Sequence, residues 1–82
     1  IAKQVDSHEY VLSARLEIDK VNDLFGLGLP ESDEYMTVGG FILHEYQSFP
    51  KLNEVVTIGH FEFRIIKSTM TKIELVRLKV KE

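Results

Sequence analysis

The spacing of apolar residues changes along this chain, and each change marks a predicted element. Two short runs of β-prone residues, Ile1–Val5 and Tyr10–Ser13, flank a polar turn and predict a hairpin. Apolar residues then recur at helical spacing over Ile18–Phe25, and Gly26 offers the left-handed conformation that ends a helix. The first third of the chain therefore predicts two strands followed by a short helix.

A second helix is predicted to begin after Thr37 and to end at Pro50. Thr37 is a favourable N-cap, because its hydroxyl accepts a hydrogen bond from an N–H of the first turn, and proline cannot continue a helix. Four apolar residues share one face of this helix, namely Val38, Ile42, Tyr46 and Phe49. Phe41 and Leu43 flank that face, which predicts a helix buried against more than one neighbour, such as a sheet and the first helix.

The C-terminal half returns to the alternation of apolar and polar residues that predicts strands. Glu54–Ile58 and Phe61–Ile65 are predicted strands joined by a tight turn. The apolar phase switches within a last strand at 73–80, and a β-bulge at Leu75–Val76 would reconcile the two phases. The predicted order is β-β-α-α-β-β-β, an α+β fold in which two short helices pack on a mainly antiparallel sheet.

Composition supports a single folded domain over residues 1–82, because 44% apolar and 28% charged residues are ordinary for a globular protein. The absence of cysteine removes disulfides, thiolate metal sites and thiol nucleophiles. The net charge is −3, with three basic and eight acidic side chains in residues 1–41 and seven and five in residues 42–82. This balance disfavours nucleic acid, which needs a concentrated basic face. No apolar run approaches the about 20 residues that cross a bilayer, so this segment is not expected to insert into a membrane.

No residue pattern predicts a catalytic, metal or cofactor site. His44 and Glu45 begin an H-E-x-x-H pattern, but Ser48 stands where the second histidine is required. The serines lack the G-x-S-x-G context of an activated nucleophile. We therefore expect a non-catalytic domain that binds neither a metal nor a cofactor.

Gly39 and Gly40 allow two interpretations. Backbone N–H groups at a helix start can bind a phosphate, whereas the missing Cβ atoms can let the helix approach a neighbouring strand. The phosphate-binding loop pattern is absent, no lysine lies nearby in the sequence, and Asp33 and Glu34 would repel an anion. Close packing is the favoured interpretation.

Two charged stretches are candidate interaction surfaces. The first is a loop formed by Glu31, Asp33, Glu34 and Tyr35. Its carboxylates could also act as an acid and base pair or bind a divalent cation, but a solvated loop is the commoner role. The second is the basic side of the last strand, formed by Arg77, Lys79 and Lys81 within a wider set that includes Arg64, Lys67 and Lys72. This side would dock onto an acidic partner or protect a sheet edge.

Several short motifs follow one another over nearly the whole chain. They are Tyr10-Val11-Leu12, Arg15-Leu16, the run from Ile18 to Leu27, Leu29-Pro30, Asp33-Glu34-Tyr35, the run from Thr37 to Leu43, Pro50, Phe63-x-Ile65 and Lys72-Ile73. In this order the chain resembles the transporter-associated domain at the C-terminus of CorC/HlyC proteins, the magnesium/cobalt efflux and hemolysin C type. It departs from the family pattern at Ser13-Ala14, Glu17 and 52–54, which are turn and cap positions.

The resemblance implies that residues 1–82 are excised from the C-terminus of a longer membrane protein. That protein would carry an N-terminal transmembrane domain and a pair of CBS modules, with this domain on the cytoplasmic side of the membrane. The implied role is to modulate ion transport through contacts with the CBS pair, the transmembrane domain or a second copy of the domain, as in a homodimer.

The family fold is also related to a lobe of PCMH-type FAD-binding proteins. A flavin- or adenine-nucleotide-binding domain is therefore the alternative function. This analogy is at the level of the fold, because the chain lacks the glycine-rich loops that would hold a pyrophosphate.

Overall fold

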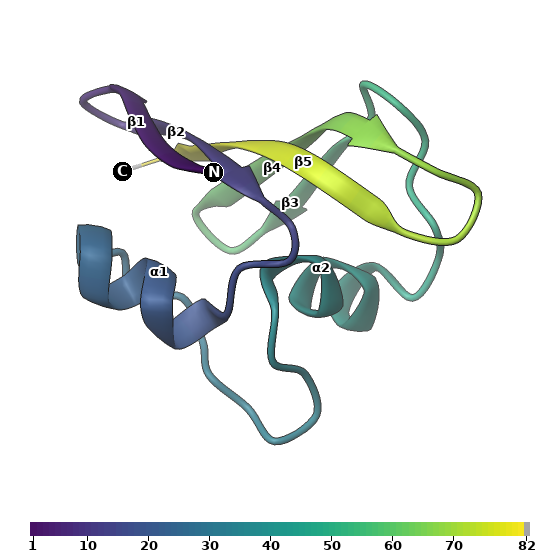
Figure 1. Ribbon diagram of the computed structural model, residues 1–82, viewed down its shortest axis with the longest axis horizontal. Helices are drawn as coiled ribbons and strands as arrows, with labels where there is room; N and C mark the ends of the chain where they lie inside the picture. Colours follow the sequence, from purple (N-terminus) through teal and green to yellow (C-terminus); the bar gives the residue numbers. More distant parts are fainter. Residues whose placement is uncertain (82) are drawn as a thin grey trace.

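Two short helices lie on one face of a five-stranded antiparallel sheet in the computed structural model, which describes residues 1–81 (Figure 1). The elements are β1 (Ala2–Asp6), β2 (Glu9–Ser13), α1 (Ile18–Phe25), α2 (Val38–Tyr46), β3 (Val55–Ile58), β4 (Phe61–Ser68) and β5 (Ile73–Val80). This order confirms the predicted α+β fold. No helix within the described part of the chain is long and apolar enough to cross a membrane.

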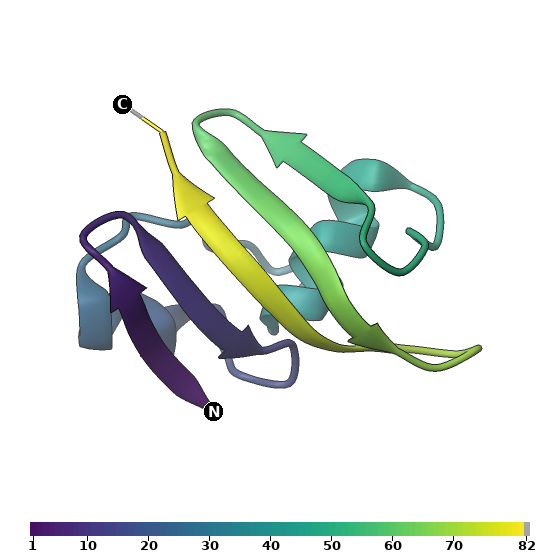
Figure 2. The same ribbon diagram turned by 90° about the horizontal axis from the view of Figure 1, so that it is seen from above.

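Strand β5 is the centre of the sheet, whose order is β1-β2-β5-β4-β3 (Figure 2). It pairs with β2 on one side and with β4 on the other. The interpretation of the last strand as a sheet edge is therefore wrong. The prediction relied on the alternation of apolar and basic residues in this strand. A central strand shows the same alternation as an edge strand when only one face of its sheet is covered.

The predicted bulge in the last strand is present as a double shift of register between β4 and β5. Opposite Leu75 and Val76, β4 holds the extra residue Ile66. One step further, β5 itself holds the extra residue Glu74 between Ile73 and Leu75. The irregularity therefore begins one residue earlier than predicted and is shared by both strands. Its effect is as expected, because Ile73 and Val76 are both buried despite their odd spacing.

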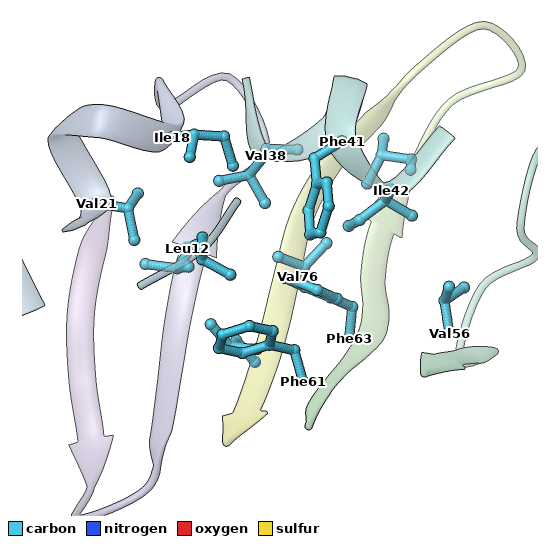
Figure 3. Close-up of a cluster of buried hydrophobic side chains, with 14 of the residues drawn as sticks. Leu12, Ile18, Val21, Val38, Phe41, Ile42, Val56, Phe61, Phe63 and Val76 are labelled. Atoms are coloured by element: carbon cyan, nitrogen blue, oxygen red, sulfur yellow. The ribbon is translucent and has the colours of Figure 1, made fainter. Parts of the chain in front are cut away.

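The core lies between the two helices and the covered face of the sheet (Figure 3). Its largest fully buried side chains are Phe41, Phe63, Leu12, Ile42, Ile65, Leu78, Val21, Val38 and Val76. The rings of Phe41 from α2 and Phe63 from β4 meet edge to face, with centroids 5.9 Å apart. Helix α2 is thus fixed over the middle of the sheet.

Helix α2 ends earlier than the position of Pro50 predicts. Gln47 adopts a left-handed conformation with φ 57°, and its N–H donates to the carbonyl of Leu43 at 2.8 Å. Phe49 therefore lies beyond the helix and is 39% exposed, and Tyr46, the last residue of α2, is 38% exposed. The assignment of both residues to the buried face is wrong. Gln47 ends α2 in the left-handed conformation, as Gly26 ends α1, and the chain leaves the helix axis at this residue.

Close packing at the start of α2 is confirmed and belongs mainly to Gly39. A Cβ atom on Gly39 would lie 3.2 Å from both the Cβ and the carbonyl oxygen of Ala14. The Gly39 N–H also donates to that carbonyl at 2.9 Å. A Cβ on Gly40 would instead meet the Thr37 hydroxyl at 3.2 Å and the Tyr35 Cβ at 3.4 Å.

We expect Ile42→Ala and Phe63→Ala each to lower the free energy of unfolding by about 2–5 kcal/mol, because each leaves a cavity in the core. Met70→Ala is the matched control, since Met70 is 98% exposed, and it should change stability by less than about 0.5 kcal/mol. Urea denaturation followed by circular dichroism measures all three. A loss below that limit for either core variant would contradict the assignment of faces.

Gly39→Ala should destabilise the chain more than Gly40→Ala. The added atoms at Gly39 press on backbone that cannot move without breaking a hydrogen bond, whereas those at Gly40 meet side-chain atoms. The same denaturation experiment compares the two variants. Equal stability would show that the helix start adjusts freely and that close approach does not require the glycine.

Candidate interaction surfaces

The sheet face that no helix covers, here the open face, carries the basic residues of the last strand. Arg77 and Lys79 point to this face, because their neighbours on β5, Val76 and Leu78, are fully buried on the other one. The prediction that they share one exposed side is correct. Lys81 lies on the same side, because it forms an ion pair with Glu62, which also points to the open face.

Two of these three cations already have an acidic partner on a neighbouring strand. Arg77 Nε donates to Glu9 Oε1 at 2.8 Å, which ties β5 to β2. Lys81 Nζ lies 3.3 Å from Glu62 Oε2. Lys79 forms no ion pair with any residue in the range 1–81. These pairs reduce the positive charge that the sequence alone suggests.

Arg64 on β4 joins this face and completes a hollow. It pairs directly with Arg77 across the ladder. Among the described residues, the Arg64 guanidinium donates one hydrogen bond, to the Asn53 carbonyl at 3.4 Å. The hollow has a volume of about 270 Å³ and is lined by Glu9, Val55, Glu62, Arg64, Arg77 and Lys79. Sequence reasoning counted Arg64 among the basic residues but did not select it, because only the β4–β5 register places it beside Arg77.

The other two basic residues of the wider set lie elsewhere. Lys67 pairs with Glu74 at 3.7 Å. Lys72 lines a groove of about 440 Å³ beside the start of α2, together with Arg15. No lysine is close to Gly39 and Gly40 in the sequence, but Lys72 is close to them in the structure. The turn between β4 and β5 brings it there, so the prediction is wrong on this point.

The N–H groups at the start of α2 are nevertheless occupied. Val38 donates to the carbonyl of Leu16 at 2.9 Å, and Gly39 to that of Ala14. Gly40 donates to the Thr37 hydroxyl at 3.1 Å, which confirms the predicted N-cap. A phosphate would have to break these bonds to use the helix start. The groove thus offers two side-chain cations and no open backbone cradle.

The acidic loop lies on the opposite side of the molecule from the open face, below the helices in Figure 1. Asn22 on α1 holds this loop by two hydrogen bonds to the backbone of Leu29, of 2.9 and 2.8 Å. Its amide also donates to Glu31 Oε2 at 3.3 Å. The structure therefore does not bring the two candidate surfaces together.

Tyr35 anchors the loop to α2 rather than presenting a free ring. Its hydroxyl donates to the Pro30 carbonyl at 2.7 Å, and its ring lies 5.1 Å from that of Phe41 and 5.4 Å from that of His44. Partial burial raises the pKa of the Tyr35 hydroxyl, and the carboxylates of Glu45 and Glu34 raise it further. The hydroxyl stays protonated and keeps donating at neutral pH.

Glu34 contributes to the same anchor. Its Oε1 lies 3.4 Å from His44 Nε2, while Glu45 Oε2 lies 3.2 Å from His44 Nδ1. The two carboxylates approach opposite ring nitrogens, so they cannot share one ion with this histidine. Among residues 1–81 no group of three or more suitable side chains could hold a metal ion.

Tyr46 and Glu54 join the end of α2 to the segment before β3. The Tyr46 hydroxyl donates to Glu54 Oε2, and the Lys51 N–H donates to Glu54 Oε1 at 2.8 Å. The bond from Tyr46, followed by that from Lys51, lowers the pKa of the Glu54 carboxyl. These bonds fix the loop that follows the early helix end.

Comparison with known proteins gives consistent results. A family model for CorC_HlyC, described as a transporter associated domain, matches residues 3–82. Hemolysin C of Brachyspira hyodysenteriae is 32% identical over 80 residues, which are 94% of this chain and 30% of that protein. The magnesium and cobalt efflux protein CorC of Salmonella typhimurium is 23% identical over 78 residues, which are 95% of this chain and 26% of that protein.

A solved structure has the same fold. The crystal structure of a Mg²⁺ and Co²⁺ transporter (CorC) associated region from Neisseria meningitidis superposes with a TM-score of 0.85 at 25% identity, and the alignment covers 96% of both chains. This chain therefore has the size of a domain that was solved on its own. It spans only 26% to 30% of the length of the two relatives above.

Asn22→Ala should lower the free energy of unfolding by about 1–3 kcal/mol, because it leaves the partly buried N–H and carbonyl of Leu29 without their partners. Asn22→Asp keeps an acceptor for the Leu29 N–H, but it turns a carboxylate oxygen toward the Leu29 carbonyl and Glu31 Oε2, so it should also lower stability. Thermal denaturation compares them. Wild-type stability of the alanine variant would show that the loop does not depend on this clamp.

Proposed function

The chain belongs to the CorC/HlyC family of transporter-associated domains, and from this premise we propose that it is a non-catalytic regulatory domain of a membrane ion transporter. Residues 1–82 then form the last domain of a longer protein that also contains a transmembrane domain and a CBS pair. The domain lies on the cytoplasmic side of the membrane and modulates the efflux of an ion such as magnesium or cobalt.

The observation that supports this role most is the match over residues 3–82, together with the small share of its relatives that the chain represents. Relatives named for magnesium and cobalt efflux contain a matching segment that makes up 26% of their length. A segment of this kind influences transport through its contacts with the rest of the protein. Those contacts must differ between two states of the transporter, since equal contacts would shift no equilibrium.

The structure offers separate surfaces for such contacts. The open face carries cations around a hollow, and the loop on the far side of the helices carries acidic groups. A domain with two differently charged sides can touch two parts of a larger assembly at once, such as the CBS pair and the transmembrane domain. A second copy of the domain is a further partner that the same surfaces suit.

The flavin or nucleotide alternative has less support. A pyrophosphate would enter the groove beside Arg15 and Lys72, where the N–H groups of the α2 start are already bonded to the protein. The flavin- or nucleotide-binding alternative is therefore supported only by the analogy between folds.

The proposal predicts that deleting residues 1–82 from the full-length transporter changes the rate of ion efflux by about fivefold or more, the low end of ordinary coupling between sites. Cellular magnesium and cobalt would be measured over time in cells that lack their own exporter. Full-length protein with Met70→Ala is the matched control, because that side chain is exposed.

Immunoblots of the membrane fraction normalise efflux to the amount of transporter, so a loss of protein is not mistaken for a loss of regulation. Identical efflux with and without the domain, at every ion concentration, would overturn the regulatory role.

A further inference from the structure

The centre of the open face places two like charges side by side. Arg64 on β4 and Arg77 on β5 are direct partners in the antiparallel ladder. Like charges at such positions destabilise a sheet. The fold itself does not need arginine at either position, because both side chains point away from the core.

The charges around this pair are unevenly compensated. Glu9 binds Arg77, and Glu62 binds Lys81. Arg64 has only a backbone carbonyl, at 3.4 Å, and Lys79 has no ionic partner in the described chain. Lys79 lies directly opposite Glu9 on β2 and Glu62 on β4, but the ion pairs of these two carboxylates go to Arg77 and Lys81. Arg64 and Lys79 thus line one hollow of about 270 Å³ without an ion pair to any described residue.

The spacing of these two cations can be derived from the register. Lys79 pairs with Glu62, and Arg64 is two residues further along β4, so Lys79 and Arg64 are diagonal neighbours. Diagonal neighbours in such a ladder are about 7–8 Å apart. Alternate residues of an extended peptide lie about 6.6–6.8 Å apart on the same side. Two carboxylates at positions i and i+2 of an extended segment therefore match the two cations.

The remaining groups of the hollow favour a polypeptide over other anions. A phosphate or an anionic lipid headgroup offers Glu9 and Glu62 only negative charge, whereas a peptide that places its carboxylates at Arg64 and Lys79 can also donate backbone N–H groups to these two glutamates. The backbone donors of β4 and β5 face their neighbouring strands, so none cradles a phosphate. Val55 is 40% exposed at the rim and offers an apolar contact.

We propose that the open face binds an extended acidic segment of polypeptide in which two carboxylates at positions i and i+2 reach Arg64 and Lys79. The guanidinium of Arg64 donates two hydrogen bonds to one carboxylate in a bidentate pair, and the Lys79 ammonium binds the other carboxylate. Arg77 stays paired with Glu9, and the two side chains form part of the wall of the hollow. This inference rests on the proposed function in one respect, because the segment then belongs to the rest of the transporter.

The test uses the 82-residue chain, because a domain of this size and fold has been solved on its own. The probe is a synthetic six-residue peptide of alternating Glu and Thr, followed by NMR of the amide signals. We expect the peptide to shift signals of β4 and β5 around Arg64 and Lys79. Changing Arg64→Gln with Lys79→Gln should weaken binding by about tenfold or more, and rising salt should weaken it further.

The matched control is Lys20→Gln with Lys51→Gln, which removes the same charge from exposed positions away from the open face. It should leave affinity within about twofold. A second peptide with its Glu residues three positions apart should bind more weakly. Thermal melts of both double variants show that the fold is kept.

Equal weakening in the control pair, or no shift of β4 and β5 signals, would overturn the site. Stronger binding of phosphatidylserine vesicles or inorganic phosphate, lost in the Arg64 and Lys79 variant, would overturn the polypeptide as occupant. Self-association in the ultracentrifuge that disappears in that variant would assign the face to a second copy instead. None of these outcomes depends on the efflux experiment, so failure here and failure of the proposed function are distinguishable.

Discussion

The packing of α2 onto the middle of the sheet is the interaction on which the rest of the structure depends. The ring of Phe41 contacts Phe63 on β4, while the first turn is bonded to the segment that follows β2. The missing side chain of Gly39 permits this approach to Ala14. One helix thus joins strands from both ends of the sequence, which in an 82-residue chain concentrates the available burial in a single core.

One consequence of this arrangement is the open face. Two short helices cover only one side of the sheet, so the residues of β2, β3, β4 and β5 that point to the other side are exposed or partly exposed. The Arg77–Glu9 pair on that side is partly exposed, at 44% and 26%, and such pairs contribute little to stability. The residues of the open face are therefore free to serve binding, since the fold is held from the other side.

Local signals in the sequence predicted the elements well. The bounds of α1 were correct because Gly26 marks its end, and Thr37 marked the start of α2. The end of α2 was not predictable in this way, because Gln47 adopts a conformation that its residue type does not announce. The central position of β5 was also hidden, since alternation shows which face a strand buries and not which strands lie beside it.

The candidate surfaces show the same limit more sharply. From sequence, the acidic loop and the basic strand were equivalent stretches of charge. In the structure, Glu31, Glu34 and Tyr35 of the loop contact Asn22, His44 and the Pro30 backbone, so these groups hold the loop in place. On the open face, ion pairs use Arg77 and Lys81 and leave Arg64 and Lys79 beside a hollow. Cations that form no ion pair with the described residues make the open face the stronger candidate of the two surfaces, and only the register of the strands shows which cations these are.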